Sequence, residues 1–116
     1  MSLSPHFERH EFACRCGCGF DTVDVELIQR LEDIRGHFGQ PVHINSSCRC
    51  LEYNRSIGSR DTSRHTQGKA ADITVLGIPP SEVHAYVDSL SDQCGLGSYD
   101  TFTHVDVSEK RRRWNG

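Results

Sequence analysis

The chain has 116 residues, a formal net charge of −3 and a hydrophobic content of 35%. This length suits one domain with its own core, but not two domains. No apolar stretch approaches the length that crosses a bilayer, and the N-terminus lacks the basic and apolar pattern of a secretory signal. The slight negative charge argues weakly against a nucleic-acid partner. The missing apolar stretch argues against a membrane partner, and we expect a monomer.

The first periodic segment follows an N-terminal arm, residues 1–20, that has no clear periodicity. Asp21 and Thr22 offer helix N-cap chemistry, and Gly36 and Gly39 mark a helix end. Between them, apolar residues recur at helical spacing, which predicts an amphipathic helix. These apolar residues are Leu27, Ile28, Leu31, Ile34 and Phe38.

Short strands and helices alternate along the rest of the chain. The expected strands cover residues 42–45, 70–75, 96–99 and 102–107. One expected helix covers residues 48–56, capped by Ser46 and Ser47, and a polar loop follows over residues 59–66. A last helix begins at Ser81, with Val83, Tyr86, Val87 and Leu90 as its buried stripe. This order predicts a small single α+β domain, residues 1–116, with an antiparallel sheet and about three helices.

The six cysteines are unevenly distributed: Cys14, Cys16 and Cys18 form one run, Cys48 and Cys50 repeat its spacing, and Cys94 stands alone. Residues two apart on an extended segment share a face, so the first three could meet Cys50 from one side of an N-terminal hook. Disulfides, reduced thiols and a structural metal site are all open, although C-x-C is not the usual zinc spacing. A structural staple or thiol cluster is favoured over a catalytic cysteine.

Residues 63–72 form the most informative stretch, because His65 and Asp72 stand in it with Gly68 between them. His104 follows later, in the centre of an alternating strand. Two imidazoles and one carboxylate can bind zinc and leave its fourth position open to water, as in catalytic zinc sites. Taken singly, each residue has an ordinary structural role, but together they predict one catalytic zinc ion.

The local chain geometry supports this ligand set. Gly68 allows the tight return that brings His65 and Asp72 together. Ser63 is positioned to form a hydrogen bond within the loop and to fix His65. A neighbouring antiparallel strand can place the imidazole of His104 opposite Asp72.

The C-terminal region gives weaker signals. The basic run from Lys110 to Arg113 is more typical of a solvated tail than of a binding patch. Tyr99 and Trp114 could wall the cleft, although packing in the core or at a sheet edge is their commoner role.

The S-x-H-x-x-G-x-A-x-D pattern of residues 63–72 and the F-x-H-x-D pattern of residues 102–106 together resemble a known family. This is the D-alanyl-D-alanine carboxypeptidase and murein endopeptidase group of zinc peptidases, whose fold the hedgehog signalling domain shares. Residues 44–50, 11–14 and 113–114 extend the resemblance over most of the chain. It implies a zinc metallopeptidase that acts on the cell wall. The compact length and the missing signal favour a phage-type lysin or an exported fragment of a longer precursor.

The resemblance also implies residue roles. His65, Asp72 and His104 become the zinc ligands, and Arg49 becomes the arginine that faces a substrate carboxylate or the developing oxyanion. Arg49 and Ser63 are then the candidate substrate-binding residues. The implied substrate is a peptidoglycan stem peptide or cross-link that contains a D-amino acid or diaminopimelate, cut by carboxypeptidase or endopeptidase action.

The general base is where this sequence departs from the better-known members, which carry an acid three residues before the last histidine. That position is Thr101 here. Asp100, at the turn before the strand, and Asp106, on the same strand face as His104, are the candidate catalytic replacements. Asp100 could instead be a solvated turn residue, and Asp106 could instead orient a ligand histidine.

Two other classes of function compete with the peptidase. The missing acid at Thr101 keeps open a non-catalytic, zinc-stabilised domain that binds cell wall or protein. A thiol-based redox or iron–sulfur protein rests on the cysteine runs alone.

Overall fold

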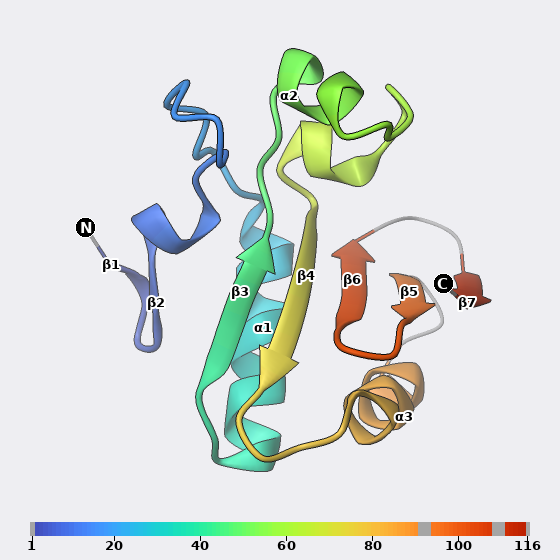
Figure 1. The fold of residues 1–116 in the computed structure, drawn as a ribbon. Coiled ribbons are helices and arrows are strands. Elements are labelled where there is room, and N and C mark those ends of the chain that lie inside the picture. Colours follow the sequence, from blue (N-terminus) through green and yellow to red (C-terminus); the bar gives the residue numbers. More distant parts are fainter. Residues whose placement is uncertain (1, 91–93, 108–110, 116) are drawn as a thin grey trace.

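The computed structural model describes residues 2–90, 94–107 and 111–115 (Figure 1). Its helices are α1 (Val25–Phe38), α2 (Leu51–Ser56) and α3 (Pro80–Leu90), with two short 3-10 helices, η1 (Arg9–Phe12) and η2 (Arg64–Gln67). Its strands are β1 (Ser2–Ser4), β2 (Phe7–Glu8), β3 (Val42–Ser46), β4 (Ala70–Val75), β5 (Cys94–Ser98), β6 (Thr103–Val107) and β7 (Arg112–Asn115). Among these, no helix is both long and apolar enough to cross a membrane.

The main sheet has five strands in the order β3-β4-β6-β5-β7, and a separate small sheet pairs β1 with β2. Its first four strands pair antiparallel, which confirms the α+β prediction, whereas β7 pairs parallel with β5. The expectation of a solvated basic tail is therefore wrong for Arg112 and Arg113, which lie on an edge strand. Arg113 is anchored by Asp88 at 2.7 Å, and Lys110 lies outside the described residues.

The two faces of this sheet have opposite character because side chains alternate along β4 and β6. Ala71, Ile73 and Val105 are buried in the hydrophobic core, to which α1 contributes its apolar face. Figure 1 shows α1 behind β3 and β4. Asp72 and His104 lie at the intervening positions, so the sheet presents them on the face opposite the core.

Helix α1 begins later than the sequence suggested. Its N-cap is Asp24, whose carboxylate accepts a hydrogen bond from the backbone N–H of Glu26 at 2.8 Å, rather than Asp21 or Thr22. The reason is tertiary, because the N–H of Asp24 donates to the carbonyl of Gly68 at 2.8 Å. This contact holds Asp24 beside the η2 loop in a non-helical conformation, so α1 begins only at Val25.

Helix α2 is also shorter than expected, beginning at Leu51 rather than Cys48. The N–H of Cys48 donates to Phe12 O, and the N–H of Arg49 donates to His65 O, both at 3.0 Å. These long-range bonds hold the segment extended, so helical bonds cannot form there. In α3, Val83 and Val87 are buried as predicted, but Tyr86 is only half-buried and Leu90, at the helix end, is 38% exposed.

Gly68 should be far less tolerant of substitution than Gly58, although both have positive φ angles (+67° and +78°). A β-carbon at Gly68 would collide with the backbone carbonyl of Thr22, whereas one at Gly58 would meet nothing within 4 Å. Both alanine variants incur backbone strain, and only Gly68→Ala adds a backbone clash. We expect Gly68→Ala to lower the free energy of unfolding by at least about 1 kcal/mol more than Gly58→Ala, measured by urea denaturation. Equal losses would contradict the tight packing of this loop.

Candidate metal centre

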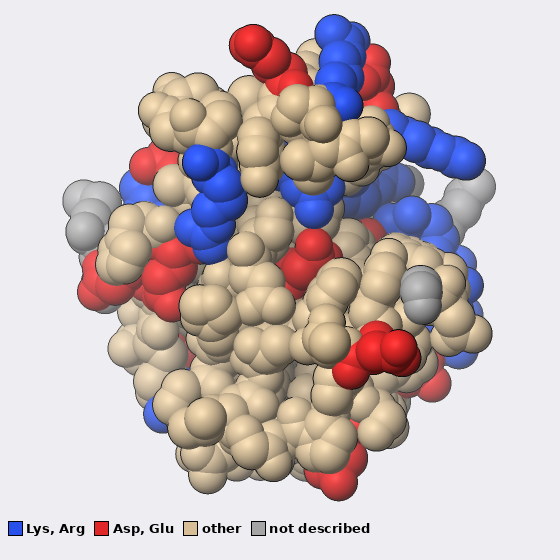
Figure 2. Space-filling view, viewed as in Figure 1, with Lys and Arg blue, Asp and Glu red and all other residues tan. Residues whose placement is uncertain are grey.

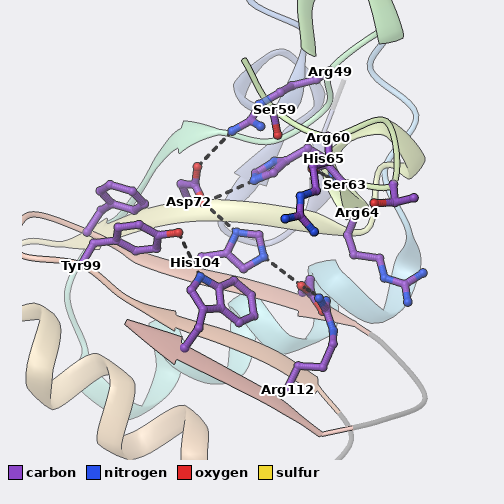
Figure 3. Close-up of a pocket in the computed structure, with 14 residues that line it drawn as sticks. Arg49, Ser59, Arg60, Ser63, Arg64, His65, Asp72, Tyr99, His104 and Arg112 are labelled. Carbon is purple, nitrogen blue, oxygen red and sulfur yellow. Dashed lines mark hydrogen bonds and ion pairs between the residues drawn. The ribbon is translucent and has the colours of Figure 1, made fainter. Parts of the chain in front are cut away.

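The polar face of the sheet and the η2 loop together enclose a pocket of about 770 Å³ (Figure 3). This volume lies in the range usual for ligand sites in proteins. Its lining includes Arg49, Ser59, Arg60, Thr62, Ser63, Arg64, His65, Asp72, Tyr99, Phe102, His104, Asp106, Arg112 and Trp114.

His65, Asp72 and His104 converge at this pocket. Asp72 on β4 is directly opposite His104 on β6 in the antiparallel register, as the sequence predicted. The 3-10 helix η2 adds His65, and the three candidate ligand atoms all lie within 4.8 Å of one another. Asp72 Oδ1 is 2.9 Å from His104 Nδ1 and 3.3 Å from His65 Nε2.

The hydrogen bonding of His65 indicates that a cation belongs between this side chain and Asp72. Its Nδ1 lies 2.7 Å from the carbonyl oxygen of Ser47, which can only accept, so Nδ1 carries the proton. In the neutral ring, Nε2 then presents a lone pair to the Asp72 carboxylate. The nitrogen lone pair and the carboxylate oxygen repel each other unless a proton or metal ion lies between them. The donor set therefore fits a divalent metal such as zinc.

His104 has the same property. Its Nε2 lies 2.8 Å from Asp106 Oδ2, and a proton on Nε2 leaves the Nδ1 lone pair facing Asp72. Asp106 is itself fixed, since Arg112 donates to its Oδ2 at 2.6 Å and the N–H of Gly95 donates to its Oδ1 at 2.9 Å. A carboxylate that accepts the outer N–H of a histidine is the usual support for a metal-binding imidazole.

The ionisation of these groups fits a positively charged centre. Burial disfavours the charged form of His104, but hydrogen bonds to Asp106 and Asp72 outweigh it and raise the pKa of His104. Burial likewise opposes ionisation of Asp72, yet hydrogen bonds from His104 and His65 hold its pKa well below the usual value. The pKa of Asp106 is lowered in the same way, against burial, chiefly by its hydrogen bond to His104. Both carboxylates are thus ionised and face a centre that needs positive charge.

Two glycines of β5 make room for these contacts. Gly95 lies between Asp106 and Arg112 across the strands, and a β-carbon on it would collide with the Asp106 carboxylate. Gly97 lies in the same way between His104 and Trp114, and a β-carbon there would come within 2.6 Å of the Trp114 indole. Gly95, Gly97 and Arg112 did not stand out as site residues in the sequence. Glycine within a strand, which often marks a close approach by a neighbour, was the available signal.

Arg49 and Ser63 lie beside the three candidate ligands. The Arg49 guanidinium donates to Asp72 Oδ2 at 3.3 Å and is also bonded to Ser46 and Asn54. Ser63 is the N-cap of η2, and its hydroxyl accepts from the N–H of His65 at 3.3 Å. One residue thus lies against the carboxylate and the other fixes the loop that carries the first histidine.

The two candidate general bases, Asp100 and Asp106, lie in different environments. Asp100 and Thr101 are exposed at the turn before β6, and neither belongs to the pocket lining of the described chain. Asp106 does line the pocket, but both of its oxygens are engaged. Tyr99 and Trp114 form part of the pocket wall rather than core, and Trp114 Nε1 donates to Tyr99 Oη at 3.0 Å.

Comparison with known proteins agrees with this geometry. The chain belongs to the peptidase M15 family, whose model matches residues 5–106. This match confirms the resemblance drawn from the two sequence motifs.

A curated relative from Haemophilus influenzae carries the name "Probable peptidoglycan L,D-endopeptidase MepK". It is 29% identical over 104 residues, a match that covers 81% of this chain and 55% of the relative. The chain therefore spans about half the length of this relative.

Substituting Gly95 should disturb the support of His104 without touching a candidate ligand. We expect Gly95→Ala to lower the free energy of unfolding by about 1–3 kcal/mol, because its methyl group must displace the buried Asp106 carboxylate. Gly36→Ala is the control: it lies in α1 with nothing within 4 Å and should stabilise by about 0.5–1 kcal/mol. Urea denaturation measures both, and the imidazole ¹⁵N resonances of His104 should shift only in Gly95→Ala. Unchanged resonances in that variant would show that Gly95 does not control Asp106.

Proposed function

We propose that this chain is a zinc-dependent peptidase that hydrolyses an amide bond in peptidoglycan stem peptides or cross-links. The convergence of His65, Asp72 and His104 at the base of a pocket, with Arg49 beside them, carries the proposal. Membership of the peptidase M15 family supports peptidase chemistry. The name of the relative from Haemophilus influenzae supports peptidoglycan as the substrate and an L,D bond as the first to test.

In this proposal His65, Asp72 and His104 hold the zinc ion. When bound, zinc would supply Lewis acidity toward the scissile carbonyl and lower the pKa of a water molecule toward about 7. His65 and His104 present nitrogen lone pairs because Ser47 O and Asp106 engage their other ring nitrogens. The chain thus fixes both imidazoles in the tautomer that a metal requires.

Arg49 supplies positive charge where negative charge develops. Its guanidinium is held by three acceptors, and its side chain is only 11% exposed, so its position is set before substrate arrives. A fixed, poorly hydrated cation stabilises a developing oxyanion more effectively than a mobile one. Its planar donor fork also suits a substrate carboxylate.

The rim of the pocket is positively charged. Arg60, Arg64 and Arg112 line it together with Arg49, and Figure 3 shows their side chains around the candidate metal ligands. On the face shown in Figure 2, Lys and Arg side chains gather in the upper half, whereas the lower half is largely uncharged with a few acidic groups. Peptides that contain D-glutamate, diaminopimelate or a terminal D-alanine carry carboxylates, which this rim would attract.

Asp106 acts in this proposal as a positioning residue for His104. Its Oδ2 accepts from both His104 and Arg112, and its side chain is 1% exposed. A carboxylate so fully engaged is suited to hold an imidazole rather than to exchange protons with substrate.

A non-catalytic, zinc-stabilised domain that binds the cell wall is the second candidate function. Among the described residues that line the pocket, the carboxylates are Asp72 and Asp106, and both are already engaged. This favours a site that holds a metal and binds an anionic peptide without turning it over. Release of a new amine from muropeptides distinguishes the two functions.

Replacing a candidate ligand tests the peptidase directly. Purified muropeptides with L,D, D,D and terminal D-Ala-D-Ala bonds are incubated with the zinc-loaded protein, and products are identified by mass spectrometry. His65→Ala should reduce hydrolysis by more than about 100-fold, because it removes a ligand rather than its support. His43→Ala, an exposed histidine on β3 outside the pocket lining of the described chain, should retain full activity. Binding of muropeptides without any new amine would favour the binding domain.

Variants of two aspartates distinguish a residue that positions His104 from one that accepts a proton. We expect Asp106→Asn to lower kcat/KM by about 10- to 100-fold, because the amide supports the Nε2–H of His104 less well. Asp100→Asn should leave turnover unchanged, since Asp100 is exposed and outside the pocket lining of the described residues. The same muropeptide assay measures both. Loss of turnover in Asp100→Asn would identify Asp100 as the proton acceptor and refute this assignment.

A further inference from the structure

A second group of potential metal ligands lies outside the pocket. Cys14, Cys16 and Cys18 come from the N-terminal hook, which we define as residues 13–20, and Cys50 is the N-cap of α2. Their four sulfur atoms all lie within 4.8 Å of one another. The sequence therefore correctly anticipated that these four cysteines meet.

The spacing of the sulfur atoms identifies the kind of site. The Sγ atoms are 3.4 Å apart for Cys14 and Cys16, 3.6 Å for Cys16 and Cys50, and 3.9 Å for Cys14 and Cys50. A disulfide would bring two of them to about 2.05 Å. Four thiolates around one tetrahedral zinc ion, each about 2.3 Å from the metal, lie about 3.8 Å from one another. These three distances, together with the 4.8 Å limit that includes Cys18, fit a mononuclear site.

We propose that Cys14, Cys16, Cys18 and Cys50 bind one structural zinc ion, separate from the ion of the peptidase site. Each thiol gives up its proton to solvent as its sulfur binds the metal, and four sulfur ligands close the coordination sphere. A two-iron cluster would spread its thiolates over two metal atoms, so the close packing of the sulfurs favours a single ion.

The backbone around the four sulfurs supports this assignment. Gly17 and Gly19 adopt φ angles of +81° and +92°, and the N–H of Cys14 donates to Phe20 O at 2.8 Å. These features turn the hook back on itself, so that its thiols share one side. The N–H of Cys50 also points at Cys14 Sγ at 3.4 Å, a contact that stabilises a thiolate.

The hook needs such an anchor, because Arg15 to Gly19 are all exposed and bury little apolar surface. Arg15 donates to the carbonyl of Ile44 at 2.8 Å, a contact that joins the hook to β3. The ion would join the hook to the segment that holds Arg49, the residue immediately before Cys50. Its role is therefore to fix the N-terminal hook against one wall of the pocket.

Metal content of the full chain, purified under reducing conditions, tests the proposal. We expect two zinc ions per chain in the unmodified protein, and one each in Cys16→Ser and in His65→Ala. Cys16 is exposed, so its serine variant should still fold. Cys94→Ala is the matched control, because Cys94 is a buried core residue on β5, and it should retain both ions. X-ray absorption of His65→Ala should show sulfur-only coordination at about 2.3 Å.

Three results would overturn the second site: two zinc ions in Cys16→Ser, iron in place of zinc, or a mass that shows disulfides among the four cysteines persisting despite the reductant. The proposed peptidase function fails separately. A chain with one zinc ion bound by nitrogen and oxygen alone would refute the thiolate site and leave the peptidase intact. A chain with one zinc ion bound by sulfur alone would refute the peptidase centre.

Discussion

The antiparallel pairing of β4 with β6 is the constraint on which the site depends. It places Asp72 directly opposite His104, so two candidate ligands meet without any loop having to position them. The same pairing turns Ala71 and Val105 toward the core, where burial stabilises the sheet. A slip of one residue in either strand would turn the candidate ligand of that strand into the core and expose its apolar residues. The hydrophobic core therefore determines which face of the sheet carries the two candidate ligands.

Glycine in β5 is the second requirement, and it comes at a cost in strand stability. A residue with a side chain would fill the space above β5, and glycine weakens the interior of a strand relative to alanine by roughly 0.5–1 kcal/mol. At Gly95 the space is taken by the Asp106 carboxylate, to which Arg112 donates, and at Gly97 by the Trp114 ring, whose centroid lies 4.9 Å from that of His104. The two glycines thus weaken β5, but they leave room for the side chains that hold His104 in place.

The sequence predicted those features that depend on neighbours in the chain or on a simple alternating pattern. Strand Ala70–Val75 and the convergence of His65, Asp72 and His104 follow from spacing, and the structure brings the three together. The role of Arg112 did not follow, because it depends on β7 pairing parallel with β5, and no local pattern distinguishes that strand from a basic tail.

The errors at helix starts have the same origin as the errors at the C-terminus. Asp24 caps α1 and Cys50 caps α2 because long-range backbone bonds hold the preceding residues extended. Local propensity favours earlier caps, and tertiary hydrogen bonds override it. Whether Asp100 is the general base stays a prediction: its side chain is exposed in the turn, two residues from the pocket wall at Phe102.

The segment from Ser47 to Cys50 connects the two groups of candidate ligands. Its residues face alternate sides, so Ser47 offers its carbonyl to His65, Arg49 reaches Asp72, and Cys50 turns toward the hook. Because Ser47 and Arg49 contact the candidate ligands of the pocket while Cys50 lies with the cysteines of the hook, a shift at one end moves contacts at the other. Anchoring it at Cys50 is therefore an efficient way to preserve the orientation of His65 and Arg49.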